Sequence, residues 1–133
     1  KDDRTLLSKM IQYGKILYLN KLLNNEEEEW VIFNTSPNKM KWTNDNEFEI
    51  WSYFAENEYF FNTNIDLRSR FISLSPYSKF NLDIDKESPG AIGRWLGYKI
   101  VNSYMNNNKL SLNELLDLDH YTIFKNSKYK PFK

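Results

Sequence analysis

The sequence predicts an all-α domain, a compact bundle of five or six helices with irregular connecting loops and little or no sheet. Three observations predict this class. Apolar residues recur at helical spacing in several segments. Capping residues stand where those segments begin. The length of 133 residues suits one core, so we expect residues 1–133 to form a single helical domain.

The first helix is predicted from about Thr5 to Leu23, with Asp3 or Thr5 as its N-cap. Its apolar stripe is wide and consists of Leu6, Leu7, Met10, Ile11, Tyr13, Leu17, Tyr18 and Leu22. Gly14 lies in the middle of this stripe, where glycine costs about 1 kcal/mol relative to alanine. A glycine at such a position indicates that another backbone approaches closely.

The segment after this helix is predicted to be irregular. Glu26–Glu29 is interpreted as a solvated acidic loop, with a site for a cation or a basic partner as the alternative. Trp30–Phe33 is predicted to be a lone strand or a strand-like loop packed on helices. Thr35–Asn38 has the composition of a turn.

A second long helix is predicted from about Thr43, its N-cap, to Phe61. Its predicted inner stripe is Phe48, Trp51, Phe54 and Ala55. A short helix is predicted from about Ile65 to Ser73, ended by Ser75-Pro76. We expect this short helix to turn Leu67, Phe71 and Leu74 inward and Arg68 and Arg70 outward. Residues 77–86 are predicted to be irregular.

The clearest helix start is Ser88-Pro89-Gly90, with Ser88 as N-cap and Pro89 as the first helical residue. This helix is predicted to reach Met105. Two short helices follow in the prediction, one opened by the capping box of Ser111 and Glu114 and one by Asp119.

Gly90, Gly93 and Gly97 share one face of that helix. We expect this face to pack closely against another helix, most simply at Gly14, with a groove for a partner or ligand as the alternative. Ser88-Pro89-Gly90 is interpreted as an ordinary cap, with an anion cradle as the alternative.

The aromatic residues are expected mostly in the core. Trp95 and Tyr98 are the best candidates for a partly exposed aromatic patch. The candidate interaction or packing residues are Gly14, Ser88, Pro89, Gly90, Gly93, Arg94, Trp95, Gly97 and Tyr98.

Composition argues against several classes of function. The 18 basic and 18 acidic residues balance, which argues against binding nucleic acid by phosphate neutralisation. The absence of Cys and the single His exclude thiolate and multi-His zinc sites within this chain. No apolar run approaches the ~20 residues that span a bilayer. We therefore predict no cofactor and no metal.

Two sets of ionisable residues are candidates for catalysis. Glu47, Glu49, Glu56 and Glu58 do not pair face to face and are interpreted as a solvated acidic face. His120, which follows Asp119, has no recognisable nucleophile partner and is interpreted as a structural or surface histidine. We therefore predict no catalytic residue.

Several segments carry a family resemblance across most of the chain and in order. They are residues 4–18, 46–54 and 70–72, the specific segment Ser88–Met105, and the ending Ser127–Pro131. Together they resemble the C-terminal region of the gliding-motility-associated lipoprotein GldB family of Bacteroidetes. Two features depart from the family pattern. The stretch from Asn24 to Met40 does not match the expected linker, and Ala91 stands where Arg is expected.

The resemblance implies that this chain is the C-terminal part of a longer lipoprotein, with a lipid anchor upstream, on the periplasmic side of the cell envelope. It implies support of gliding motility and the type 9 secretion machinery. It also implies a distant similarity to helical zinc metallopeptidase-like domains, in which residues 14–18 would occupy the metal helix without a His or Glu.

Three functions are left open. The favoured one is a non-enzymatic domain that contacts other envelope proteins, with no nucleic acid and with the membrane reached only through the anchor. The second is a degenerate zinc-metallopeptidase-like domain whose ligands lie upstream. The third is a cell-wall glycan-binding module that uses Trp95, Tyr98 and neighbouring rings.

Overall fold

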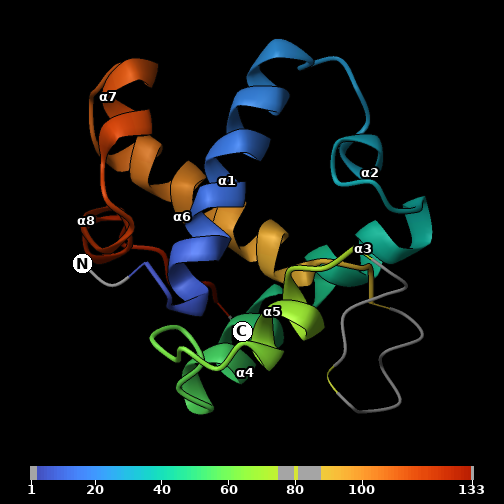
Figure 1. Cartoon of the computed structure of the whole chain (residues 1–133). Coiled ribbons are helices and arrows are strands. Elements are labelled where there is room, and N and C mark those ends of the chain that lie inside the picture. The colour runs from blue at the N-terminus through green and yellow to red at the C-terminus, as the bar shows by residue number, and fades with distance from the viewer. Residues whose placement is uncertain (1–2, 75–79, 81–87, 133) are drawn as a thin grey trace.

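The computed structural model describes residues 3–74, 80 and 88–132, and all regular structure in these ranges is helical (Figure 1). The all-α prediction is thus confirmed, with more and shorter helices than the five or six expected. The eight helices in the described ranges are α1 (Leu6–Leu23), α2 (Glu29–Ile32), α3 (Pro37–Asp45), α4 (Glu47–Glu56), α5 (Asp66–Phe71), α6 (Ile92–Asn107), α7 (Leu112–Asp117) and α8 (His120–Asn126).

The two longest helices, α1 and α6, cross at the centre of the molecule and form its most extensive helix contact. In Figure 1, α7 and α8 lie to the left of this crossing, α2 and α3 to the right, and α4 and α5 below it. The short helices therefore surround a central pair, and each buries one face against it or against a neighbour.

Large side chains fill the core, because the chain has few small aliphatic residues. The largest fully buried side chains are Phe54, Phe71, Leu6, Leu7, Met10, Ile11, Ile92, Leu96, Ile100, Leu115, Ile123 and Val101. Phe54 lies among other rings, with centroids at 4.8 Å from Phe71, 5.9 Å from Phe60 and 6.1 Å from Tyr59. Offset and edge-on aromatic pairs of this kind stabilise beyond their buried area.

Three predicted helix starts are present. The Thr5 side chain accepts a hydrogen bond from the Ser8 amide at 3.1 Å and caps α1. Ser111 and Glu114 form the capping box of α7. The Asp119 carboxylate caps α8 by accepting from the Thr122 amide at 2.8 Å.

The segment between α1 and α4 corrects two predictions. Trp30–Phe33 is not strand-like, because residues 29–32 form the single turn of α2. The expected turn at residues 35–38 is the start of α3, whose N-cap is Ser36 and whose first residue is Pro37. This Ser-Pro pair carries the same start signal as the one at residues 88 and 89.

The long helix predicted from Thr43 to Phe61 is divided into α3 and α4. Thr43 is not an N-cap, since it lies inside α3 and its hydroxyl donates to the Lys39 carbonyl at 2.7 Å. The break falls at Asn46, whose side-chain amide donates to the Trp42 carbonyl at 2.7 Å. An asparagine that bonds its own helix competes with the backbone and ends it.

The region of α5 corrects two further expectations. Arg70 does not point outward. It is half-buried and donates to the Tyr59 and Tyr53 hydroxyl oxygens at 3.3 and 3.2 Å. Leu74 does not point inward, since 46% of it is exposed. The predicted stop at Ser75-Pro76 lies outside the described residues, as does the irregular segment 77–86 apart from Phe80.

Candidate functional site

The glycines of α1 and α6 lie where neighbouring backbones leave no room for a side chain. A Cβ atom on Gly97 would be 1.9 Å from the Met10 carbonyl oxygen, and one on Gly14 would be 2.5 Å from the Gly97 carbonyl carbon. The two helices therefore approach closely at Gly14, where the sequence predicted their contact. Gly97 lets α6 rest directly on the backbone of α1.

The other two glycines face the end of α5 and the residues that follow it. A Cβ atom on Gly93 would be 2.7 Å from the Phe71 carbonyl oxygen, and one on Gly90 would be 1.9 Å from the Leu74 carbonyl oxygen. Backbone atoms of this domain thus fill the space beside each of these glycines. The glycine face is not an open groove among the described residues.

The start of α6 differs from the prediction. The helix begins at Ile92, and its N-cap is Ala91 and not Ser88. Ser88 and Pro89 are buried ahead of the helix. The left-handed backbone of Ala91 is not helical, so the helix starts only at Ile92, and Gly90 ahead of it lies against the Leu74 carbonyl. Buried Ser88 does not present an anion cradle.

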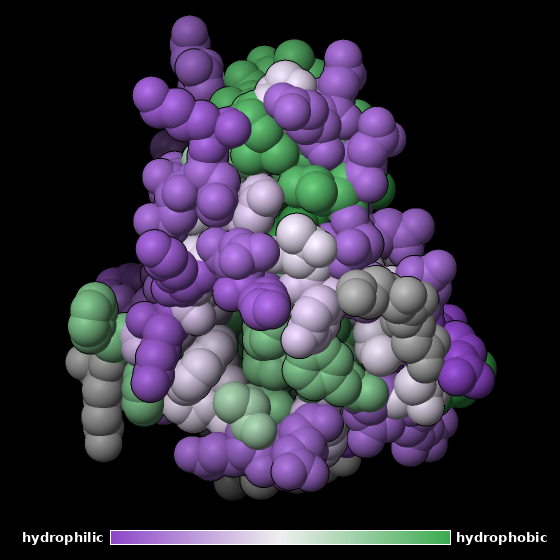
Figure 2. Space-filling view, turned by 90° about the vertical axis from the view of Figure 1, so that its left-hand side faces the viewer, coloured by the Kyte–Doolittle hydropathy of each residue, from purple (hydrophilic) through white to green (hydrophobic). Residues whose placement is uncertain are grey.

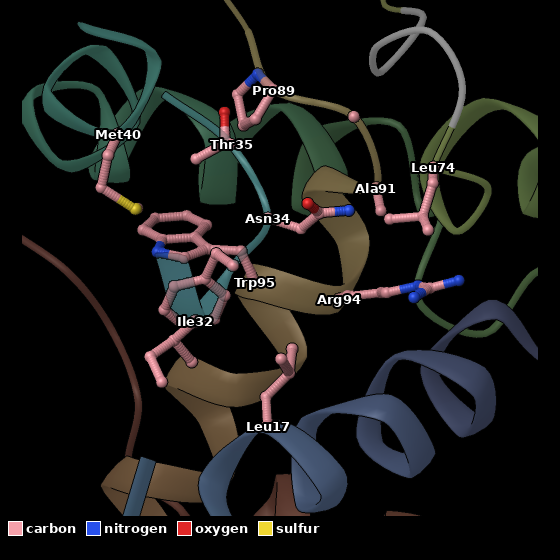
Figure 3. Close-up of a pocket in the computed structure, with 12 residues that line it drawn as sticks. Leu17, Ile32, Asn34, Thr35, Met40, Leu74, Pro89, Ala91, Arg94 and Trp95 are labelled. Atoms are coloured by element: carbon pink, nitrogen blue, oxygen red, sulfur yellow. The ribbon is translucent and has the colours of Figure 1, made fainter. Parts of the chain in front are cut away.

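A small pocket lies at this start of α6, between α1 and the connection from α2 to α3 (Figure 3). Its volume is about 110 Å³. The lining residues are Leu17, Ile32, Phe33, Asn34, Thr35, Met40, Leu74, Pro89, Gly90, Ala91, Arg94 and Trp95. Four of the candidate residues singled out from the sequence therefore line this pocket, namely Pro89, Gly90, Arg94 and Trp95, and most of its wall is apolar.

Arg94 is the one ionisable residue in the lining. Its Nε atom donates to the Ile72 carbonyl at 2.9 Å, and its guanidinium carbon lies 4.0 Å from the centre of the Tyr13 ring. In Figure 3 its charged end lies at the edge of the pocket, on the opposite side from Trp95 and Met40. Arg94 therefore ties α6 to α1 and α5 with its head group, while its stem borders the pocket.

Two lining residues have a left-handed backbone although neither is glycine. Asn34 has φ 56° and Ala91 has φ 57°. This conformation costs an L-residue about 1–2 kcal/mol, and alanine has no polar side chain to offset the cost. The surrounding packing therefore holds Ala91 in place at the mouth of the pocket.

Replacing Ala91 by glycine is expected to leave stability unchanged or to raise it by about 0.5–1 kcal/mol, because the left-handed strain is removed. The matched control is Ala55→Gly in α4, a right-handed helical position where the same change should cost about 1 kcal/mol. Urea unfolding of both variants measures the difference. Equal losses in the two variants would contradict a strained Ala91.

Trp95 and Tyr98 do not form an exposed aromatic patch, which corrects the prediction. Only 2% of Trp95 and 5% of Tyr98 is exposed. The Tyr98 ring packs against Phe33 at 5.1 Å and Tyr18 at 6.5 Å between centroids. The Trp95 indole N–H is buried and has no hydrogen-bond partner among the described residues. These two rings therefore do not offer the exposed aromatic surface that the glycan-binding hypothesis requires.

Burial raises the pKa of Tyr98 to about 12, with the nearby charge of Glu29 as a second cause. A raised pKa in the folded state means that the stability from neutral Tyr98 is fully present below about pH 10 and is lost as the pH rises towards 12. We expect the unfolding midpoint of the wild type to fall over this range, and Tyr98→Phe to fall less. Urea unfolding at a series of pH values measures this, and parallel curves would contradict it.

The ionisable residues that were candidates for catalysis are scattered. His120 is 8% exposed, and its Nδ1 lies 4.0 Å from a carboxylate oxygen of Asp3. Glu47 is half-buried and accepts a 2.7 Å hydrogen bond from the Tyr129 hydroxyl, so it does not belong to a solvated face. No group of three or more His, Cys, Asp or Glu in the described part of the chain could hold a metal ion.

The exposed rings that sequence reasoning missed lie elsewhere. Phe61 is 53% exposed and Tyr121 is 38% exposed, and their ring centroids are 6.2 Å apart. The sequence Phe60-Phe61 just beyond α4 could have indicated an exposed ring, because the side chains of consecutive residues point in different directions and only one of the two can enter the core. No described helix is both long enough and apolar enough to span a membrane.

Together the fold and the pocket define a small helical domain with an apolar cavity beside the first turn of α6. The family model described as gliding motility protein GldB matches residues 1–131, so the chain belongs to the GldB family, a family of gliding-motility lipoproteins. Searches of curated proteins and of solved structures found no match.

Proposed function

We propose that this chain is a non-enzymatic domain of a Bacteroidetes envelope lipoprotein that supports gliding motility and type 9 secretion by contacting other envelope proteins. The lipid anchor lies upstream of this chain and holds the domain on the periplasmic side. Membership of the GldB family supports the link to motility and the lipoprotein character. The contact with proteins is supported by the pocket at the start of α6.

The observation that carries the proposal is the size and chemistry of that pocket. Its volume of about 110 Å³ is below the ~150 Å³ of an apolar cavity that holds benzene, and far below the ~300 Å³ where small-molecule sites begin. Its lining has one cation and no carboxylate or imidazole for acid–base chemistry. Such a pocket suits one aliphatic side chain from a partner protein.

The test is complementation of a gliding bacterium from which the gene has been deleted. The variant Thr35→Trp places a large side chain at the pocket without replacing a fully buried residue. The matched control is Thr63→Trp, an exposed loop position that is not in the lining. We expect the first variant to lose colony spreading and secretion at normal protein levels, and the second to retain both.

Three results would contradict the proposal. A deletion strain that glides and secretes normally would remove the link to motility. Thr35→Trp cells that behave like the wild type would remove the pocket as the contact site. Stoichiometric zinc together with peptidase activity in the full-length protein would favour the hypothesis of a zinc-metallopeptidase-like domain over that of a non-enzymatic domain.

A further inference from the structure

An open groove lies where the residues that follow α4 meet α8 and the segment beyond it. Its volume is about 670 Å³. The lining residues are Trp51, Ala55, Glu58, Phe60, Phe61, Asn62, Phe124, Lys125, Lys128 and Tyr129. The floor is aromatic, with the Phe61 and Phe124 ring centroids 5.7 Å apart. On the side of the molecule that carries α7 and α8, Figure 2 shows apolar atoms in the open between hydrophilic side chains.

The charge at this groove is mainly positive. Lys125 and Lys128 are exposed, and neither forms an ion pair within the described residues. One carboxylate, Glu58, also belongs to the lining. We call the surface formed by these ten lining residues the basic groove. Its chemistry suits an apolar segment with acidic residues beside it.

The chain carries such a segment at the end of α1. Leu22, which belongs to the predicted apolar stripe of the helix, is 48% exposed, and the next residue, Leu23, is 75% exposed. Glu26, Glu27 and Glu28 follow after Asn24 and Asn25, are exposed, and form no ion pair within the described residues. We call residues 22–28 the acidic tip. In Figure 1 the end of α1 that leads into the tip stands clear at the top of the molecule.

The groove and the tip lie at opposite ends of α1. Backbone hydrogen bonds from the Leu6 amide to the Asn62 carbonyl (2.9 Å) and from the Leu7 amide to the Phe60 carbonyl (2.8 Å) fasten the groove to the first turn. The 18 residues of α1 span about 27 Å at ~1.5 Å per residue. The tip therefore cannot reach the groove of its own chain.

From these complementary surfaces we propose that copies of this chain associate head to tail, with the acidic tip of one copy in the basic groove of the next. The leucines of the tip cover the exposed rings, and its glutamates face Lys125 and Lys128. Because the two surfaces differ, the contact is heterologous, and every open assembly keeps a free tip at one end and a free groove at the other. The occupant of the groove is thus a second copy, independent of any partner at the α6 pocket.

The experiment is sedimentation velocity of the purified chain over a range of protein and salt concentrations. We expect the average mass to rise with protein concentration, and the association to weaken as salt screens the charges. Two variants reverse one surface each. The groove variant is Lys125→Glu/Lys128→Glu, and the tip variant is Glu26→Lys/Glu27→Lys/Glu28→Lys. Each variant alone should associate at least about tenfold more weakly than the wild type, because its tip and its groove then carry charge of the same sign.

A mixture of the two variants gives the decisive result. The reversed tip of one variant matches the reversed groove of the other, and their unchanged surfaces also match, so the mixture should associate like the wild type. Glu58→Lys should tighten the association of the wild type, because it removes the one carboxylate of the groove. The control Lys109→Glu lies outside both surfaces and should change nothing.

All of the substituted positions are exposed, so circular dichroism and thermal unfolding of each variant should match the wild type. A wild type that stays monomeric at low salt and high concentration would overturn the proposal. So would a mixture that stays dissociated, or a groove variant that associates as the wild type does. None of these outcomes affects the proposed role in motility, which the pocket variant tests.

Discussion

Replacing Gly97 by alanine is expected to destabilise the domain by about 3 kcal/mol or more, and Gly97→Leu to prevent stable folding. The new Cβ atom would lie 1.9 Å from the Met10 carbonyl oxygen and 2.5 Å from its carbon. These are backbone atoms of α1, so no side-chain rotation relieves the overlap. The two central helices must separate, and the cavity that opens between them adds to the cost.

Two matched substitutions separate this overlap from the general effect of alanine on a helix. Gly93→Ala meets the Phe71 carbonyl oxygen at 2.7 Å, so it should be destabilising but less so than Gly97→Ala. Asn106→Ala lies on the exposed last turn of α6 and should be neutral or slightly stabilising. Urea unfolding gives the three values. A Gly97→Ala variant as stable as the wild type would contradict the close crossing of α1 and α6.

The features that sequence could predict are those that local chemistry decides. The spacing of apolar residues gives the all-α class, and side-chain caps mark the starts of α1, α7 and α8. Gly14 in mid-helix indicated a close approach because glycine is costly there without a reason. The reason is that the backbone of Gly97 occupies the space where a side chain of residue 14 would lie.

The features that sequence could not predict depend on contacts between distant residues. Tyr98 is buried because Phe33, at the end of α2, covers its ring, and no pattern near Tyr98 indicates this neighbour. Ala91 takes a left-handed conformation that its side chain does not favour, so only the packing around it explains the late start of α6. The pocket likewise draws its wall from α1, α2, α3 and α6, and none of these carries a motif for it.

Replacing Phe54 by alanine is expected to destabilise the domain by about 3–5 kcal/mol. Phe54 is fully buried in α4, and its ring lies within 4.8–6.1 Å of the Phe71, Phe60 and Tyr59 rings. These neighbours come from two parts of the chain, namely α5 and the segment that follows α4. Because large rigid rings cannot collapse into the space that one of them leaves, most of the cavity should persist in the variant.

The matched control is Phe61→Ala, which removes the same side chain from a position that is 53% exposed. Its loss should be about 1 kcal/mol or less, since roughly half of the ring already contacts water. Urea unfolding of both variants, followed by tryptophan fluorescence, measures the difference. Similar losses for the two would mean that the ring cluster around Phe54 does not hold α4 and α5 together, and that the central pair of helices alone carries the stability of the fold.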